Sequence, residues 1–123
     1  MRLVTLLCCC VLAACVNGNV CEDDHCVCAA NEPCQHTCSP GGNDCHIQCA
    51  ADQTCDVTCD SAEDCHVEAS SSSHSTVDCA GSPDCHVTCP LGGCTVDNCV
   101  GSNCIVACFT GAASIHGTTA SCP

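Results

Sequence analysis

The sequence predicts an all-β fold, a small disulfide-rich parallel β-solenoid with two repeats of about ten residues in each coil. Three observations predict it. A phrase Cys-x-(Val or Ile)-x-Cys returns about every ten residues, turn-forming residues fill the intervals, and 22 of the 123 residues are cysteine. Because nothing recurs at the 3.6-residue period of a helix, the repeats are expected to form strands.

The apolar residue at the centre of each phrase is flanked by polar residues, with cysteine beyond them. Alternation with a period of two is typical of a strand that buries one face. We therefore expect Cys, Val and Ile inside and His, Asp, Thr, Gln or Glu outside, with turns in the Gly-, Pro-, Ser-, Asp- and Asn-rich intervals. The central residues are Ile47, Val57, Val67, Val77, Val87, Val96 and Val106.

Alternate phrases differ, which predicts two strands in each coil. The tripeptide Asp-Cys-His stands at 44–46, 64–66 and 84–86, twenty residues apart, and the phrases between lack it. Strand, turn, strand, turn fits into about twenty residues, and successive coils would stack about 4.8 Å apart as parallel strands. This arrangement resembles the β-roll of calcium-binding nonapeptide-repeat proteins. Their Gly-Gly-x-Gly-x-Asp motif is absent from the sequence, so their calcium chemistry is not implied.

The composition indicates that disulfides, and not a large apolar core, stabilise the fold. The chain has no Trp, no Tyr and a single Phe109, so it lacks the large side chains of a conventional core. Small exported domains of this kind are usually held by disulfides. From Cys21 to Cys122 the chain has eighteen cysteines, an even number that allows complete pairing.

The simplest pairing rule closes each turn with the two cysteines that flank it. At one turn both cysteines are absent together, as Ala69 and Ser75, which is what a bonded pair predicts. A rival rule joins strand ends across the coil, as in Cys45–Cys59 and Cys65–Cys79, and spacing alone leaves it open. The first rule gives Cys38–Cys45, Cys49–Cys55, Cys59–Cys65, Cys79–Cys85, Cys89–Cys94 and Cys99–Cys104, with Cys108–Cys122 and two bridges among Cys21, Cys26, Cys28 and Cys34.

Residues 1–14 are predicted to be an export signal. Arg2 precedes a short apolar run, Leu3 to Leu12, which falls well below the roughly 20 residues that span a bilayer. The run ends in Leu12-Ala13-Ala14-Cys15, which resembles the lipobox of bacterial lipoproteins. That resemblance implies cleavage before Cys15, a diacylated Cys15 and, because no Asp follows, a place in the outer membrane. Two acyl chains suffice for stable anchoring.

The alternative is an ordinary secretory signal, cut near Ala14 or Gly18, and a soluble secreted protein. Beyond the signal we expect a tether and irregular N-terminal cap over 15–33 and the repeats over 34–122, about four coils. The lipobox together with the tandem phrases resembles the cysteine-rich repeat lipoproteins of predatory soil bacteria. That resemblance implies a surface lipoprotein with no known chemistry.

Charge limits the partners. The chain has fourteen acids and one basic residue, Arg2, for a formal net charge of −13. Such a surface repels phosphate backbones and anionic lipids, so nucleic-acid binding is excluded, and cations are the favoured partners. A protein or glycan partner outside the cell is compatible with this charge, and the sequence does not identify one.

The candidate binding residues are histidines and acids that should stack on one face. His46, His66 and His86 are expected to form an outward ladder that could share Zn²⁺ or Cu²⁺, with Glu68 as a possible oxygen ligand. A stack of Asp44, Asp64 and Asp84 beside it could hold Ca²⁺ weakly. The alternative is a solvated polar face with ordinary turn aspartates and no cofactor.

Three other functions are less compatible with the sequence. The stretch His25-Cys26-Val27-Cys28 could be a soft metal clip, as in metallothioneins, although exported cysteines are usually oxidised. Ice binding, as in the small disulfide-rich solenoids of insects, would need regular Thr-x-Thr rows, which the phrases lack. Catalysis is not expected, because no triad, phosphate loop or apolar pocket stands out.

The sequence therefore predicts a non-enzymatic, lipid-anchored, acidic surface protein that acts as a structural spacer or as an adhesion or binding module. An extracytoplasmic protein that binds divalent metal is the alternative, and an ice-binding solenoid is a weaker one.

Overall fold

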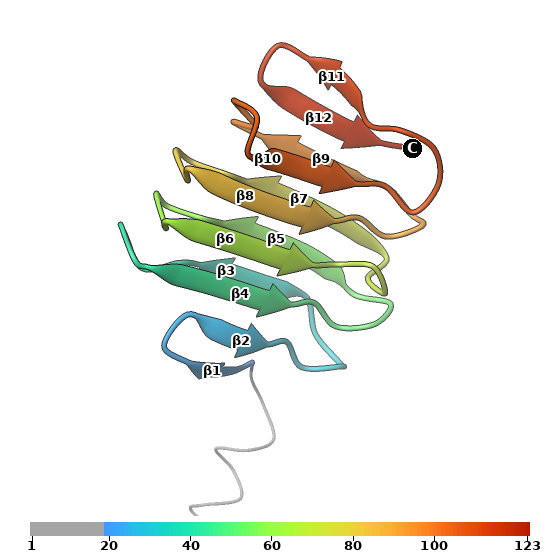
Figure 1. Cartoon of the computed structure of the whole chain (residues 1–123). Helices are drawn as coiled ribbons and strands as arrows, with labels where there is room; N and C mark the ends of the chain where they lie inside the picture. Colours follow the sequence, from blue (N-terminus) through green and yellow to red (C-terminus); the bar gives the residue numbers. More distant parts are fainter. Residues whose placement is uncertain (1–18) are drawn as a thin grey trace, which may run out of the picture.

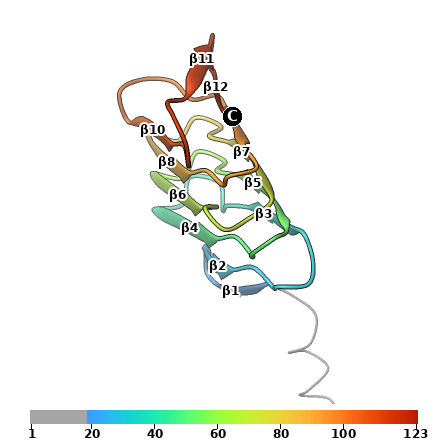
Figure 2. The ribbon, with the colours of Figure 1, turned by 90° about the vertical axis from the view of Figure 1, so that its right-hand side faces the viewer.

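The computed structural model describes residues 19–123, and these form two six-stranded sheets that face each other across a narrow interior (Figures 1 and 2). The described residues contain no helix, and so none that is long and apolar enough to cross a membrane. The predicted export signal and the lipid on Cys15 lie outside the described residues. The fold class is confirmed as an all-β parallel solenoid.

The first sheet, here called the histidine sheet, takes every second strand of the repeats. In spatial order it consists of β1 (Val20–Glu22), β2 (His25–Val27), β4 (Asp44–Gln48), β6 (Asp64–Glu68), β8 (Asp84–Thr88) and β10 (Cys104–Ala107). The second sheet consists of β11 (Ser114–His116), β12 (Thr119–Cys122), β9 (Cys94–Asp97), β7 (His74–Asp78), β5 (Thr54–Thr58) and β3 (Cys34–Thr37).

The register of the strands explains the twenty-residue period. β4, β6 and β8 are parallel neighbours that place Cys45, Cys65 and Cys85 level with one another. In the second sheet the same parallel stacking joins β3, β5, β7 and β9. A chain that alternates between the sheets brings each phrase beside the one two phrases earlier, so like residues stack.

The interior is a thin layer of aliphatic side chains bordered by sulfur. Ile47, Val67 and Val87 point inward from the histidine sheet and Val57, Val77 and Val96 from the second sheet, each at most 3% exposed. Burying each aliphatic side chain contributes about 1.5–3 kcal/mol, and a single row of them makes a small core.

Nine disulfides border this layer. Six are the pairs given by the rule of flanking cysteines, and Cys108–Cys122 is the bridge expected to complete them. At the N-terminal end the bridges are Cys21–Cys26 and Cys28–Cys34. Neither cross-coil pair of the rival rule is present. Successive bridges also touch, because Cys59 Sγ lies 3.9 Å from Cys85 Sγ in the next coil. The sulfurs therefore pack along the rod as well as across each turn.

The ends of the solenoid differ from the repeats. The predicted cap is not irregular where it is described, because β1 and β2 form an antiparallel hairpin and β2 pairs in parallel with β4. Cys26 occupies the level of Ile47 and is 3% exposed, so a cystine sulfur fills the place of the aliphatic residue. At the other end β12 runs antiparallel to both β9 and β11, and β11 is the edge strand of the second sheet.

Among the turns that connect β3 to β10, one has no disulfide, the turn between β6 and β7. There the hydroxyl of Ser72 donates to the carbonyl of Ala69 at 2.9 Å. Ser75 takes the position of Cys55 and Cys94 in the neighbouring coils. Its hydroxyl is buried without a hydrogen-bond partner, which costs about 1–3 kcal/mol.

Replacing Ala69 and Ser75 together by cysteine is expected to add a tenth bridge and to raise the free energy of unfolding by about 2 kcal/mol, the loop-closure value for a loop of this length. The equivalent bridge Cys49–Cys55 has the same separation of six residues and a Cα–Cα distance of 5.9 Å. Urea unfolding of the oxidised protein measures the gain. Ser75→Ala is the control, since it removes the unpartnered hydroxyl without adding a bridge. A double variant that forms the bridge and is no more stable than this control would contradict the prediction.

Candidate functional site

The outward side chains of the histidine sheet stand in columns along the rod. The histidine column consists of His25, His46, His66 and His86, one from each of β2, β4, β6 and β8. The aspartate column beside it consists of Asp44, Asp64 and Asp84, two residues earlier on their strands. A strand's period of two places both columns on the same face, so imidazoles and carboxylates alternate across the surface.

The spacing within the histidine column is uneven. The ring centroids of His46 and His66 are 4.9 Å apart and the rings are tilted by 48°. His25 lies 5.9 Å from His46, and His86 lies 6.0 Å from His66. The predicted ladder of His46, His66 and His86 is therefore present as a stack. The closest pair of the four-histidine column is the middle one, His46 and His66.

His25 is a member of the column that the sequence did not indicate. It precedes His46 by twenty-one residues instead of twenty, and Asp24-His25 lacks the intervening cysteine of the Asp-Cys-His motif. The parallel pairing of β2 with β4 nevertheless places His25 level with His46. A search for histidine one residue before a buried cysteine or valine would have found it.

One member of the aspartate column contacts the histidine of the preceding strand of the sheet. Asp44 Oδ2 lies 2.9 Å from His25 Nε2, and both side chains are more than half exposed. A pair as exposed as this contributes little to stability, about 0–1 kcal/mol. Among residues 19–123 it is the one aspartate–histidine pair of the two columns that lies within 4.0 Å. The register gives Asp64 the same position relative to His46, and Asp84 relative to His66.

Glu68, the predicted oxygen ligand, is turned toward its own chain. Its Oε1 accepts a hydrogen bond of 2.5 Å from the Ser70 hydroxyl and a longer one, 3.4 Å, from the Ser70 amide. Glu68 lies two residues after His66 on the same outward face. Its carboxylate is therefore already engaged at the start of the β6–β7 turn.

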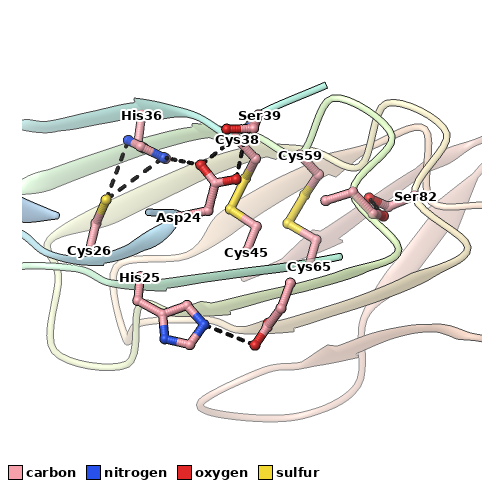
Figure 3. The surroundings of a disulfide bond; sticks show 12 residues. Asp24, His25, Cys26, His36, Cys38, Ser39, Cys45, Cys59, Cys65 and Ser82 are labelled. Carbon is pink, nitrogen blue, oxygen red and sulfur yellow. Dashed lines mark hydrogen bonds and ion pairs between the residues drawn. A yellow bond between two sulfur atoms is a disulfide. The ribbon is translucent and has the colours of Figure 1, made fainter. Parts of the chain in front are cut away.

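The N-terminal corner holds a buried acid instead of a metal clip (Figure 3). Both oxygens of Asp24 accept from the Ser39 amide, at 3.1 and 3.0 Å, and His36 Nε2 lies 3.5 Å from Oδ1. Cys26 is bonded to Cys21 and Cys28 to Cys34. Because a metal needs the thiolate, the metallothionein-like hypothesis is wrong for these cysteines.

The outward face of the second sheet carries hydroxyls mixed with acids. Its two columns are Gln35, Asp56, Thr76 and Thr95, and Thr37, Thr58, Asp78 and Asp97. Asp78 accepts a hydrogen bond from Asn98 Nδ2 at 2.7 Å, and Asp97 accepts one from the Thr119 hydroxyl at 2.8 Å. Carboxylates interrupt both columns, so the regular threonine rows associated with ice binding do not form along β3, β5, β7 and β9.

Among residues 19–123, every group of three potential metal ligands whose ligand atoms lie within 4.8 Å of one another contains disulfide-bonded sulfur. Such sulfur is not a thiolate and is a poor ligand. The histidine and aspartate columns do not form such a group in the unliganded structure, but they place imidazoles and carboxylates side by side on one face. Comparison of the chain with models of protein families, with curated proteins and with solved structures found no match.

Proposed function

We propose that the protein is a non-enzymatic, disulfide-stapled, acidic module that acts outside the cytoplasm as a spacer or adhesion module at the cell surface. The observation that carries the proposal is the pairing of all eighteen cysteines from Cys21 to Cys122 around a thin aliphatic layer. Disulfides in this density form and persist in oxidising compartments. A fold that depends on them belongs outside a reducing cytoplasm.

The shape of the molecule supports a role in presentation. Figure 2 shows the two sheets facing each other along the rod. The side chains that point between the sheets are buried, so the two broad faces are formed by the side chains that point outward. Each coil adds one strand to either sheet, so the length of the rod grows by about 4.8 Å per coil while its cross-section stays constant. A rod of this kind holds a ligand or a neighbouring surface at a fixed distance.

Charge selects the partner of such a rod. All fourteen acids lie between Glu22 and Asp97, and no Lys or Arg follows Arg2. The negative potential of the rod repels anionic surfaces and attracts cations to its two faces. The favoured partner is a basic or neutral protein segment or a neutral glycan, and it should dissociate more readily as salt increases if basic groups dominate the contact.

The N-terminal anchor at Cys15 is part of the proposal and has a direct test. Mature protein isolated from its own membrane is expected to show, by intact mass, a diacyl or triacyl addition on Cys15 and eighteen hydrogens fewer than the fully reduced chain. Cys15→Ser is expected to move the protein into the medium. A wild-type mass with an unmodified or removed Cys15 would favour the secreted form, and free thiols in the native protein would contradict export.

A further inference from the structure

We infer that the histidine column binds one divalent transition-metal ion, Zn²⁺ or Cu²⁺, between His46 and His66. This site does not depend on how the protein is anchored or on what the rod holds apart. It follows from three features of the histidine sheet: the spacing of two imidazoles, the register of the aspartate column beside them and the rigidity of the strands beneath.

The spacing of the imidazoles selects this pair. A metal–nitrogen bond of about 2.0–2.1 Å places each ring centroid about 3.2 Å from the metal, and a tetrahedral angle then separates two centroids by about 5.2 Å. The observed separation of His46 and His66 is 4.9 Å. The outer pairs, at 5.9 and 6.0 Å, would require an angle of about 140° at the metal.

Asp64 is the third ligand, assigned from the strand register. It stands to His46 as Asp44 stands to His25, two residues along the next strand of the same face. In the His25 pair that relation already brings the carboxylate oxygen to 2.9 Å from the ring nitrogen. Two imidazoles and one carboxylate, with water in the remaining position, suit Zn²⁺ or Cu²⁺ better than Ca²⁺ or Mg²⁺.

The site is assembled by side-chain rotation. The ligand atoms of His46, His66 and Asp64 do not form one of the groups closer than 4.8 Å in the unliganded structure. His46 and Asp64 are exposed, so binding has to order both side chains. The backbone needs no movement, because Cys45–Cys38 and Cys65–Cys59 fix the strands on which the histidines lie.

The test is a Zn²⁺ titration of the oxidised protein, followed by the ring proton signals of histidine and by calorimetry. We expect one ion per chain, with the His46 and His66 signals shifted most. His66→Gln should weaken binding at least tenfold, and Asp64→Asn several-fold. His116→Gln is the matched control, since His116 is an exposed histidine on β11 outside the column, and it should stay within twofold of the wild type. Any cysteine before residue 19 is common to all variants and cancels in the comparison.

Three outcomes would overturn the inference. These are unchanged histidine signals at millimolar Zn²⁺, an equal loss in His66→Gln and His116→Gln, and the same response to Mg²⁺ at the same ionic strength. The last would show that cations gather around the acidic rod without a defined site. Circular dichroism of each variant verifies that the fold is retained, and none of these outcomes bears on anchoring or on the spacer role.

Discussion

Reduction of the nine disulfides is expected to unfold the protein. Each bridge of five to seven residues' separation closes a short loop and contributes about 2 kcal/mol by the chain-entropy estimate. Folded domains are stable by only about 5–15 kcal/mol, so the loss of a few bridges removes the margin. The aliphatic layer from Ile47 to Val96 is too thin to compensate.

Far-UV circular dichroism before and after reduction and alkylation measures this effect. The strand signal and the cooperative thermal transition should both disappear in the reduced, alkylated protein. Treatment with the alkylating reagent alone is the control and should leave both intact, because the eighteen cysteines from Cys21 to Cys122 offer no thiol. Retention of strand content and of the melting transition after full reduction would show that the aliphatic layer is sufficient.

Gly92→Ala is expected to be the most damaging single substitution among the glycines, with a loss of about 3 kcal/mol or more. A Cβ at residue 92 would overlap the carbonyl oxygen of Ser73. Ser73 belongs to the turn before β7, and its amide is bonded to the Gln53 carbonyl at 2.9 Å. A clash with backbone fixed in this way is relieved only by shifting one turn against the next.

Gly101→Ala is the control for this substitution. Gly101 has a φ of +86° and no atom within 4 Å of the added Cβ, so its cost is limited to backbone strain of about 1–2 kcal/mol. Urea unfolding of both variants gives the comparison. If Gly92→Ala were no more destabilising than Gly101→Ala, the close stacking of the β8–β9 turn on the β6–β7 turn would be contradicted.

The parts of the fold that local chemistry determines could be predicted from the sequence. Strand periodicity placed Val67 and Val87 inside, and the twenty-residue recurrence of Asp-Cys-His placed like strands in one sheet. Turn closure by flanking cysteines was favoured by the joint absence of cysteine at Ala69 and Ser75, while spacing alone left pairing across the coil open. Each of these features depends on residues within one coil or on one repeat distance.

The ends could not be predicted, because the chain there departs from the repeat. Strand direction is not encoded in spacing, so the antiparallel β11–β12 hairpin around Gly117, with a φ of +63°, gave no repeat signal. In Asp24-His25-Cys26 the cysteine follows the histidine instead of preceding it. His25 therefore did not match the Asp-Cys-His motif and suggested a metal clip. The stacking of the histidines and aspartates in columns could be predicted from the repeat. The orientation of each imidazole ring could not, because it depends on neighbouring side chains and on solvent.

Mapping of the disulfides by mass spectrometry of the non-reduced, digested protein tests the central claim most directly. The account predicts peptides linked across single turns, Cys49–Cys55, Cys59–Cys65 and Cys79–Cys85 among them, with no free thiol from Cys21 to Cys122. Linkages that run across the coil, such as Cys45–Cys59, or a predominance of free thiols in the native protein would contradict it.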